Sequence, residues 1–418
     1  MSEPFTRALL FVKQGRYREA EHYLRQAIQN DPQDPQSFFF LATCLMRDPK
    51  NRLEALSMID QALRLCPNRA FYHAQRANIL ILLGHTKEAL DAVEQARRLA
   101  PDSPDSYVAE SVVMLVSGKP QDAERAARQA LALDGENEAA GDSLADALRL
   151  QGKTEESDAH IRGLLARNPE NPWTHSSAGM LALQQGAVPA AERHFLAALR
   201  IDPEHPEARE GLLHAFRARS PFYRAYLKYS FAMERLGRAR RGLVVIGLLL
   251  LMQLANVTFV GPLAPIGFAL VAVYCLFVLW IWVARGVGNL FLLFDRFARH
   301  ALRPGEKREA IVVGGGVLFG LALFGAGLLL KQVGLIFLGL TLVGAVFPMS
   351  LVFTNRSKAG RIVFSLIGAF VYLGGLISFA LLFVPARHAG DFAASLFGST
   401  MILALITTWI GNIPALRR

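Results

Sequence analysis

The sequence predicts an all-α protein in which a solenoid of helical hairpins is followed by a six-helix transmembrane bundle. Helix-ending prolines recur at intervals near 34 residues in the first half, and six apolar runs of near-spanning length fill the second half. A basic, aromatic segment, Ser220–Arg241, separates the two halves. We therefore expect a hairpin array at 1–219, an elbow at 220–241 and a membrane domain at 242–418.

The composition supports this division. The chain has 418 residues, 52% of them hydrophobic, and a net charge of +10. The basic excess lies after Ser220, with 19 Lys and Arg against 5 Asp and Glu, whereas the preceding part carries 26 against 30. Because no basic excess remains on the array, nucleic acid is not an expected partner. The three cysteines form no CxxC pair, which indicates a reducing compartment and no cysteine metal site.

The array contains six units that share three marks. The helix-ending residues are Pro32, Pro67, Pro101, Pro169 and Pro203, with Gly135 at the remaining position. The glycines predicted to close the first helix of a unit are Gly15, Gly84, Gly118, Gly152 and Gly186. The small residues that let the second helix pack closely are Ala20, Ala89, Ala123, Ser157 and Ala191, followed seven residues later by Ala27, Ala62, Ala96, Ala130 and Ala198. Leu164 replaces the later small residue in the fifth unit, which predicts looser packing there.

These units resemble the tetratricopeptide repeat (TPR), and GRYREAEHYLRQAIQNDP and GAVPAAERHFLAALRIDP match its helical hairpin closely. The resemblance covers roughly Pro4 to Pro203 and implies a curved solenoid whose first helices line a concave, protein-binding surface. The segment PEAREGLLHAFRAR, after Pro203, is expected to form a solvating cap helix.

The resemblance also implies which residues face the groove. The predicted partner-binding residues are Phe39, Phe71, Asn78, Leu82, Val108, Val112, Trp173 and Met180. Further groove-facing positions are Ile81, Val116, Leu183, Asp142, Asp146 and Arg149. The set is mostly apolar and lacks a basic cluster that would clamp a terminal carboxylate. The alternative is that several of these residues are buried between helices.

The elbow combines six cations with five aromatic residues, which is typical of a helix at a membrane surface, a solvated linker helix being the alternative. A second basic segment, near 287–303, is expected to form an interfacial amphipathic helix. The predicted lipid-interface residues are Arg238, Arg240, Arg241, Arg296, Arg299 and Arg303.

The predicted spans are Gly242–Val260, Ala264–Ala284, Ala310–Leu330, Val333–Phe353, Ile362–Val384 and Phe392–Ile413. Cations are concentrated in the elbow, in 285–308, in 355–361 and at the C-terminal end. By the positive-inside rule both termini and the array are cytoplasmic. Alanine, arginine and glycine usage favours a bacterial inner membrane.

No catalytic, metal or cofactor motif is present in the sequence. None of the spans as drawn contains Asp, Glu, Lys or Arg, which argues against a pump. Asp295, Arg296, Arg299 and His300 form a dense polar group beside the bilayer, and Asp295 is the one candidate for a catalytic carboxylate.

We therefore expect a membrane-anchored scaffold that recruits a protein partner for assembly of a membrane complex, and not an enzyme. The alternatives are a small-solute or lipid transporter regulated by the array, and a membrane enzyme using Asp295. Membrane lipids are expected as further partners, and a homo-oligomer is left open.

Overall fold

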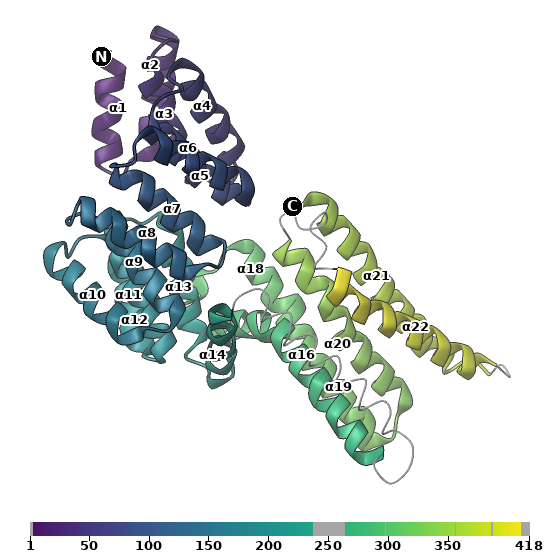
Figure 1. Ribbon diagram of the computed structural model, residues 1–418. Helices are drawn as coiled ribbons and strands as arrows, with labels where there is room; N and C mark the ends of the chain where they lie inside the picture. The colour runs from purple at the N-terminus through teal and green to yellow at the C-terminus, as the bar shows by residue number, and fades with distance from the viewer. Residues whose placement is uncertain (1–2, 237–263, 297, 356, 386–387, 411–418) are drawn as a thin grey trace. The chain divides into compact units, whose positions relative to one another are not determined.

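The first half of the chain folds into six successive helical hairpins (Figure 1). The computed structural model describes residues 3–236, 264–296, 298–355, 357–385 and 388–410, and all regular elements among them are helical. The hairpins pair α1 (Glu3–Lys13) with α2 (Tyr17–Asn30), α3 (Pro35–Leu45) with α4 (Arg52–Leu65), α5 (Ala70–Leu83) with α6 (Thr86–Leu99), α7 (Pro104–Val116) with α8 (Pro120–Leu133), α9 (Glu138–Gln151) with α10 (Thr154–Arg167), and α11 (Pro172–Gln185) with α12 (Val188–Ile201). The predicted hairpin solenoid is therefore confirmed.

Five glycines turn the chain between the two helices of a hairpin. All five predicted helix-closing glycines, Gly15, Gly84, Gly118, Gly152 and Gly186, have φ between 71° and 82°. A side chain would be strained in this left-handed conformation, so glycine ends the first helix and lets the second begin two residues later. This explains why a glycine recurs in the repeat.

Small residues bring the helices of each hairpin into close contact. Ala20, Ala89, Ala123, Ser157 and Ala191 are all fully buried. The looser packing expected at Leu164 is not found, because α9 carries Gly141 opposite it. A methyl group added at Gly141 would lie 2.6 Å from a Leu164 methyl carbon, so the larger side chain fills the space that the glycine leaves.

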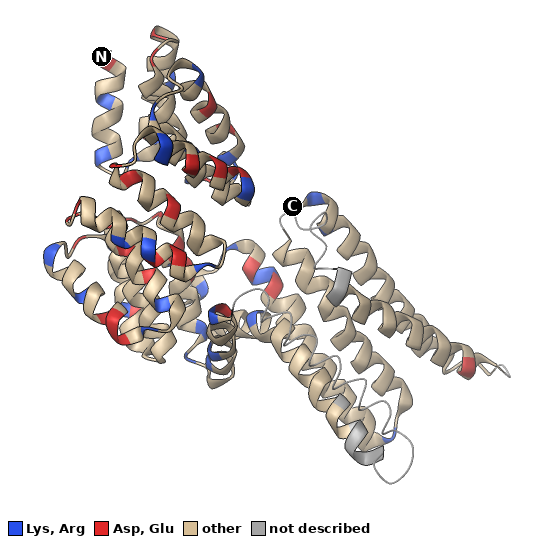
Figure 2. Cartoon of the chain, viewed as in Figure 1, with Lys and Arg blue, Asp and Glu red and all other residues tan. Residues whose placement is uncertain are grey.

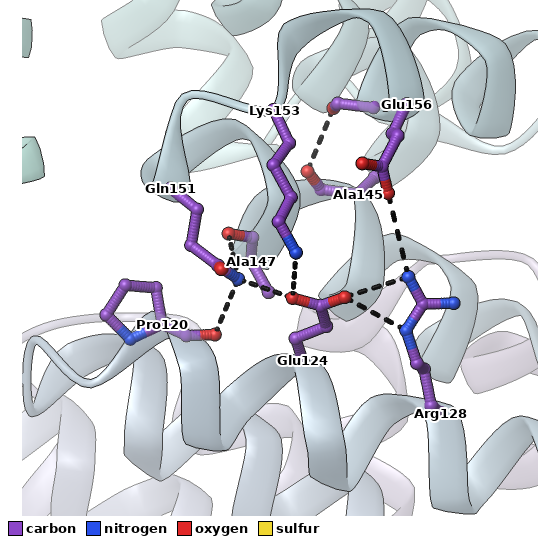
Figure 3. A network of polar contacts seen from close by, with 9 residues as sticks. Pro120, Glu124, Arg128, Ala145, Ala147, Gln151, Lys153 and Glu156 are labelled. Carbon is purple, nitrogen blue, oxygen red and sulfur yellow. Dashed lines mark hydrogen bonds and ion pairs between the residues drawn. The ribbon is translucent and has the colours of Figure 1, made fainter.

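Hydrogen bonds between hairpins reinforce the array, and Figure 3 shows the network around Glu124 of α8. The Glu124 carboxylate accepts hydrogen bonds from Lys153 Nζ (2.8 Å), Gln151 Nε2 (2.7 Å) and Arg128 Nη2 (2.8 Å). Burial would raise the pKa of Glu124, but the hydrogen bonds from Lys153, Gln151 and Arg128 lower it to about 2. The carboxylate thus joins α8 to the turn between α9 and α10.

The chain forms two compact units, which divide it within α13 (Pro206–Arg217) and α14 (Pro221–Arg235). Unit 1 contains Met1–Leu212 and Phe231–Gly242, and unit 2 contains Leu213–Ser230 and Leu243–Arg418. The second half of α13 and the first part of α14 therefore pack in unit 2. The helix predicted as a solvating cap is largely buried there: Leu213 is 1% exposed and Arg217 is 4% exposed.

Long apolar helices make up most of the described part of unit 2. They are α16 (Ala264–Phe294), α19 (Gly316–Leu330), α20 (Val333–Thr354), α21 (Lys358–Leu381) and α22 (Ala389–Ile410). Three shorter elements join α16 to α19: α17 (Ala298–Ala301), α18 (Pro304–Glu309) and the π-helical turn η1 (Ala310–Gly315). Figure 2 shows Lys, Arg, Asp and Glu distributed over the hairpin helices, whereas α19 and α20 carry almost none.

Within the described residues, five segments are long and apolar enough to cross a membrane: Ala272–Phe294, Pro304–Leu330, Val333–Thr354, Lys358–Leu381 and Ala389–Thr407. They correspond to the last five predicted spans. The first predicted span, Gly242–Val260, lies outside the described residues. The segment 287–303, predicted as one interfacial helix, is divided: its first part continues α16 to Phe294, and α17 is a separate turn.

Glycines allow a close backbone contact between α19 and α20. A methyl group added at Gly339 of α20 would lie 2.6 Å from the Gly320 carbonyl oxygen and 2.5 Å from the Phe324 amide nitrogen of α19. The two backbones can approach this closely because neither glycine carries a side chain. Gly320 and Gly339 thus mark the packing of α19 on α20, whereas nothing lies within 4 Å of the position of a methyl group added at Gly316.

Candidate functional site

The eight predicted partner-binding residues, which we call the array face, all lie on first helices of hairpins. Phe39 is on α3, Phe71, Asn78 and Leu82 on α5, Val108 and Val112 on α7, and Trp173 and Met180 on α11. Phe71 is 49% exposed and Trp173 is 46% exposed, whereas Phe39 is 6% exposed. The Phe39 ring packs 4.3 Å from the Phe71 ring, so Phe39 supports its neighbour from beneath. The other five members are partly buried.

Beside Trp173, a polar group connects α9 to α11. Asp142 accepts hydrogen bonds from Thr174 Oγ1 (2.6 Å) and Asn171 Nδ2 (3.3 Å), and the Asn171 side-chain oxygen caps the first turn of α11. Burial raises the pKa of Asp142 to about 7. Two further predicted groove residues, Asp146 and Arg149, pair with each other at 3.3 Å. The Asp142 contacts hold α9 to α11 next to the exposed Trp173 ring, whereas the Asp146–Arg149 pair lies within α9.

A second constellation lies in unit 2 and consists of Arg217, Arg285, Asn289 and Glu309, which we call the polar junction. Arg217 Nε donates to Asn289 Oδ1 (2.8 Å), and Asn289 Nδ2 donates to Glu309 Oε2 (3.2 Å). Arg285 Nε lies 3.3 Å from the same Glu309 oxygen. Arg217, Asn289 and Glu309 are 4%, 0% and 1% exposed. The junction therefore joins α13, α16 and α18 through buried, charge-assisted contacts.

The local sequence makes room for the Arg217 side chain. A methyl group at Gly288 would lie 3.2 Å from Arg217 Cγ and from a Tyr223 ring carbon, so a glycine allows both side chains to cross α16 closely. Tyr223 is itself buried, and its hydroxyl lies 2.8 Å from His214 Nδ1. Burial lowers the pKa of His214 to about 3, so the imidazole is neutral at physiological pH. A neutral histidine adds no further positive charge beside Arg217.

The π-helical turn η1 begins directly after Glu309. Its Gly314 packs on α16, where an added methyl group would lie 2.5 Å from the Gly286 carbonyl oxygen. Such turns replace the regular hydrogen-bond pattern of an α-helix by a wider one and occur frequently at functional sites. The wide turn, the glycine contact and the polar junction thus lie together at one end of α16.

Aromatic side chains of the elbow pack against the same helix. The rings of Phe222, Tyr226 and Tyr229 lie 6.3, 6.2 and 6.1 Å from the ring of Trp280, and the Tyr229 ring lies 5.3 Å from that of Phe277. In the described part of the predicted elbow, these aromatic side chains therefore pack against α16.

The members of the polar group predicted at the bilayer surface, Asp295, Arg296, Arg299 and His300, differ in their contacts. Asp295 accepts a hydrogen bond from Arg219 Nη1 (2.9 Å) and caps the amide of Ala298 (3.0 Å). Arg296, Arg299 and His300 are exposed, as is Arg303. Three predicted lipid-interface residues, Arg238, Arg240 and Arg241, lie outside the described residues.

The sequence did not predict the polar junction. The second predicted span ends at Ala284, immediately before Arg285. The third begins at Ala310, immediately after Glu309. In the structure both residues belong to helices of spanning length, Ala272–Phe294 and Pro304–Leu330. Hydropathy assigns charged residues to loops, but it does not register that these two charges pair with each other. The isolated Asn289 in an apolar stretch was the available signal.

Comparisons with known proteins match the array. The tetratricopeptide-repeat family model matches residues 5–70 and 143–206, which confirms the predicted repeat class. Among solved structures, YrrB, described as a TPR protein with an unusual peptide-binding site, is 21% identical, with 45% of this chain and 96% of that chain covered and a TM-score of 0.29. PilF of Pseudomonas aeruginosa is 20% identical, with 50% and 94% covered and a TM-score of 0.35. The Cut9–Hcn1 complex of the APC/C is 18% identical, with 51% and 42% covered and a TM-score of 0.42. A comparison with curated proteins gives no match.

Proposed function

We propose that this chain, whose residues 5–70 and 143–206 match the tetratricopeptide repeat, is a membrane-anchored adaptor that brings a protein partner to the cytoplasmic face of a bacterial inner membrane. Tetratricopeptide repeats are protein-interaction modules, and the five apolar helices supply a membrane anchor. The adaptor would serve the assembly of a membrane complex.

The observation that carries the proposal is the exposure of large aromatic side chains on the array face. Phe71 and Trp173 leave about half of their surface in solvent, although most apolar side chains of the first helices are buried. Exposed aromatic residues are typical anchors of protein interfaces, because they bury a large area with little loss of conformational freedom. A peptide segment or helix that presents apolar side chains fits this surface.

The chemistry of the spans favours an adaptor over the transporter alternative. The buried hydroxyls of Thr341, Ser378 and Thr407 donate to carbonyl oxygens of their own helices. Hydroxyls satisfied in this way need no solute or ion as a partner. The membrane-enzyme alternative loses support because its carboxylate, Asp295, is engaged by Arg219 and by the cap at Ala298.

The test is affinity purification of the full-length protein in mild detergent with and without charges on the array face. Phe71→Asp combined with Trp173→Asp should abolish recovery of the partner, since burying an unpaired carboxylate against an apolar partner costs more than burying an unpaired neutral polar group. Leu53→Asp combined with Leu133→Asp is the matched control, because these leucines are similarly exposed but lie on second helices, α4 and α8. The control should retain the partner.

Thermal melting distinguishes loss of binding from loss of folding. Both double variants should melt within a few degrees of the unchanged protein, since exposed positions contribute little to folding stability. Retention of the partner by a folded Phe71/Trp173 variant would refute the array face as the recruiting surface.

A further inference from the structure

We propose that the connection between α16 and α19 binds the headgroups of anionic phospholipids. The five basic residues concerned, which we call the basic rim, are Arg296, Arg299, Arg303, Lys307 and Arg308. All five are exposed. Arg296, Arg299 and Arg303 lie between the spanning segments Ala272–Phe294 and Pro304–Leu330, and Lys307 and Arg308 lie in the first five residues of the second segment, so the rim lies at a bilayer surface whichever way the helices are oriented.

The acids nearest to the rim in sequence offset only part of its positive charge. Asp295 pairs with Arg219 and caps Ala298, and Glu306 accepts a hydrogen bond from the Arg303 amide (2.7 Å). Glu309 is 1% exposed and belongs to the polar junction. Among the ion pairs of the described residues, none involves a cation of the rim. Five exposed cations therefore remain available to phosphate groups.

Apolar side chains border the rim on both spanning segments, Ala272–Phe294 and Pro304–Leu330. Phe294, the last residue of α16, is 82% exposed, Phe291 is 53% exposed, and Ile311 at the start of η1 is 63% exposed. Cations beside exposed aromatic and aliphatic side chains match a phospholipid, in which the phosphate and the acyl chains are adjacent. A soluble polyanion would use the cations but gain nothing from Phe294.

The experiment compares lipid binding by purified full-length proteins in a neutral detergent. Native mass spectrometry measures binding of dioleoyl phosphatidylglycerol and dioleoyl phosphatidylcholine to the unchanged protein and to a triple variant, Arg296→Gln with Arg299→Gln and Arg303→Gln. Each basic residue near a surface contributes about 1 kcal/mol of attraction to anionic lipid, or roughly fivefold in affinity. The triple variant should therefore bind phosphatidylglycerol at least tenfold more weakly, with phosphatidylcholine binding unchanged.

Two further variants control for charge number and for folding. Arg98→Gln with Arg125→Gln and Arg162→Gln removes three exposed arginines from the array and should leave phosphatidylglycerol binding unchanged. Replacing the three rim arginines by lysine keeps the charge and should keep the preference. Should the glutamine variant not fold, Lys307→Gln with Arg308→Gln provides the same comparison, with an expected loss of at least threefold.

Two results would overturn the proposal. The first is an undiminished preference for phosphatidylglycerol in a folded glutamine variant of the rim. The second is displacement of the lipid by an equal concentration of glycerol phosphate, which would indicate a site for a free phosphate group. The inference needs the membrane anchor but not the proposed partner, because its variants and its readout do not involve the array face.

Discussion

Arg217 and Asn289 are 72 residues apart in the chain, yet they share a 2.8 Å hydrogen bond from which solvent is excluded. The bond attaches the end of α13 to α16 and, through Asn289, to Glu309. A buried polar chain of this kind holds only while each member keeps its partner, since an orphaned polar group in the interior is destabilising.

Replacing Arg217 by methionine should therefore destabilise unit 2 by about 3 kcal/mol, because Asn289 loses its donor and a cation leaves the surroundings of the buried Glu309. Thermal melting in detergent, followed by intrinsic fluorescence, measures the change. Arg219→Gln is the control, since its ion pair with Asp295 is 47% exposed on the arginine side and should contribute at most about 1 kcal/mol. Equal losses in the two variants would contradict a special role for the junction.

Gly339 is expected to tolerate no side chain, in contrast to Gly325. Leucine at Gly339 would collide with the α19 backbone at Gly320 and Phe324 and separate the two helices, with a loss of about 1–3 kcal/mol or more. Leucine at Gly325 meets no atom within 4 Å of its first carbon and should be neutral. Both changes increase hydropathy, so insertion into the membrane cannot explain a difference. Melting temperatures and limited proteolysis check the prediction, which fails if the two variants behave alike.

His205 should make the array less stable in mild acid. Its imidazole is fully buried, and Nδ1 accepts a hydrogen bond from the Ala208 amide (3.3 Å), which requires an unprotonated nitrogen. Burial lowers its pKa to about 4, with Asp202 opposing the shift and Arg47 adding to it; Glu207 lies 3.4 Å from Nδ1. The unfolded state, with a pKa of about 6.5, thus binds more protons between pH 6.5 and 4.

The contribution of His205 to the free energy of unfolding is therefore fully present above pH 6.5. It is lost as the pH falls toward 4, by at most about 1.4 kcal/mol per pH unit. His205→Asn keeps an acceptor for the Ala208 amide and should remove the part of the pH dependence of stability that His205 contributes. His22→Asn, on the exposed surface of α2, should not. Melting curves between pH 5 and 8 provide the measurement, and identical slopes in the His205 variant and the unchanged protein would exclude the mechanism.

The loop cations predict the orientation of the chain. Reporters fused before Met1 or after Arg418 should give a cytoplasmic signal, whereas reporters inserted at Lys331, between α19 and α20, should give the opposite signal. The same opposite signal is expected at Gly261, which lies outside the described residues. A periplasmic signal from the N-terminal fusion would reverse the proposed location of the array.

Much of the fold could be predicted from the sequence because its determinants are local. A glycine with positive φ or a small residue on a helix face acts within one hairpin, and the recurrence of both at a fixed spacing makes them visible. Apolar runs predict spanning helices for the same reason. The packing of Leu164 against Gly141 was predicted incorrectly because the compensating residue lies on another helix.

The polar junction could not be predicted because its members are far apart in the chain and each has an ordinary local interpretation. Arg217 fits a cap helix, Asn289 an interfacial helix, and Arg285 and Glu309 the loop residues next to the ends of spans. Their meaning depends on tertiary contacts between α13, α16 and α18. For the array face, all eight predicted residues lie on first helices, whereas the burial of Phe39 depends on the neighbouring ring of Phe71.

The distance in sequence between Arg217 and its partners also orders events during synthesis. All six hairpins precede Arg217, so the ribosome has completed the array before any of the junction's other residues exist. At about 5–20 residues per second, roughly 4–14 s pass before Asn289 is added, and Glu309 comes 20 residues later. Until then Leu213 and Arg217 lack the helix that covers them. Closure of the junction therefore marks the moment at which α16 and α18 have both been made and have met the second half of α13.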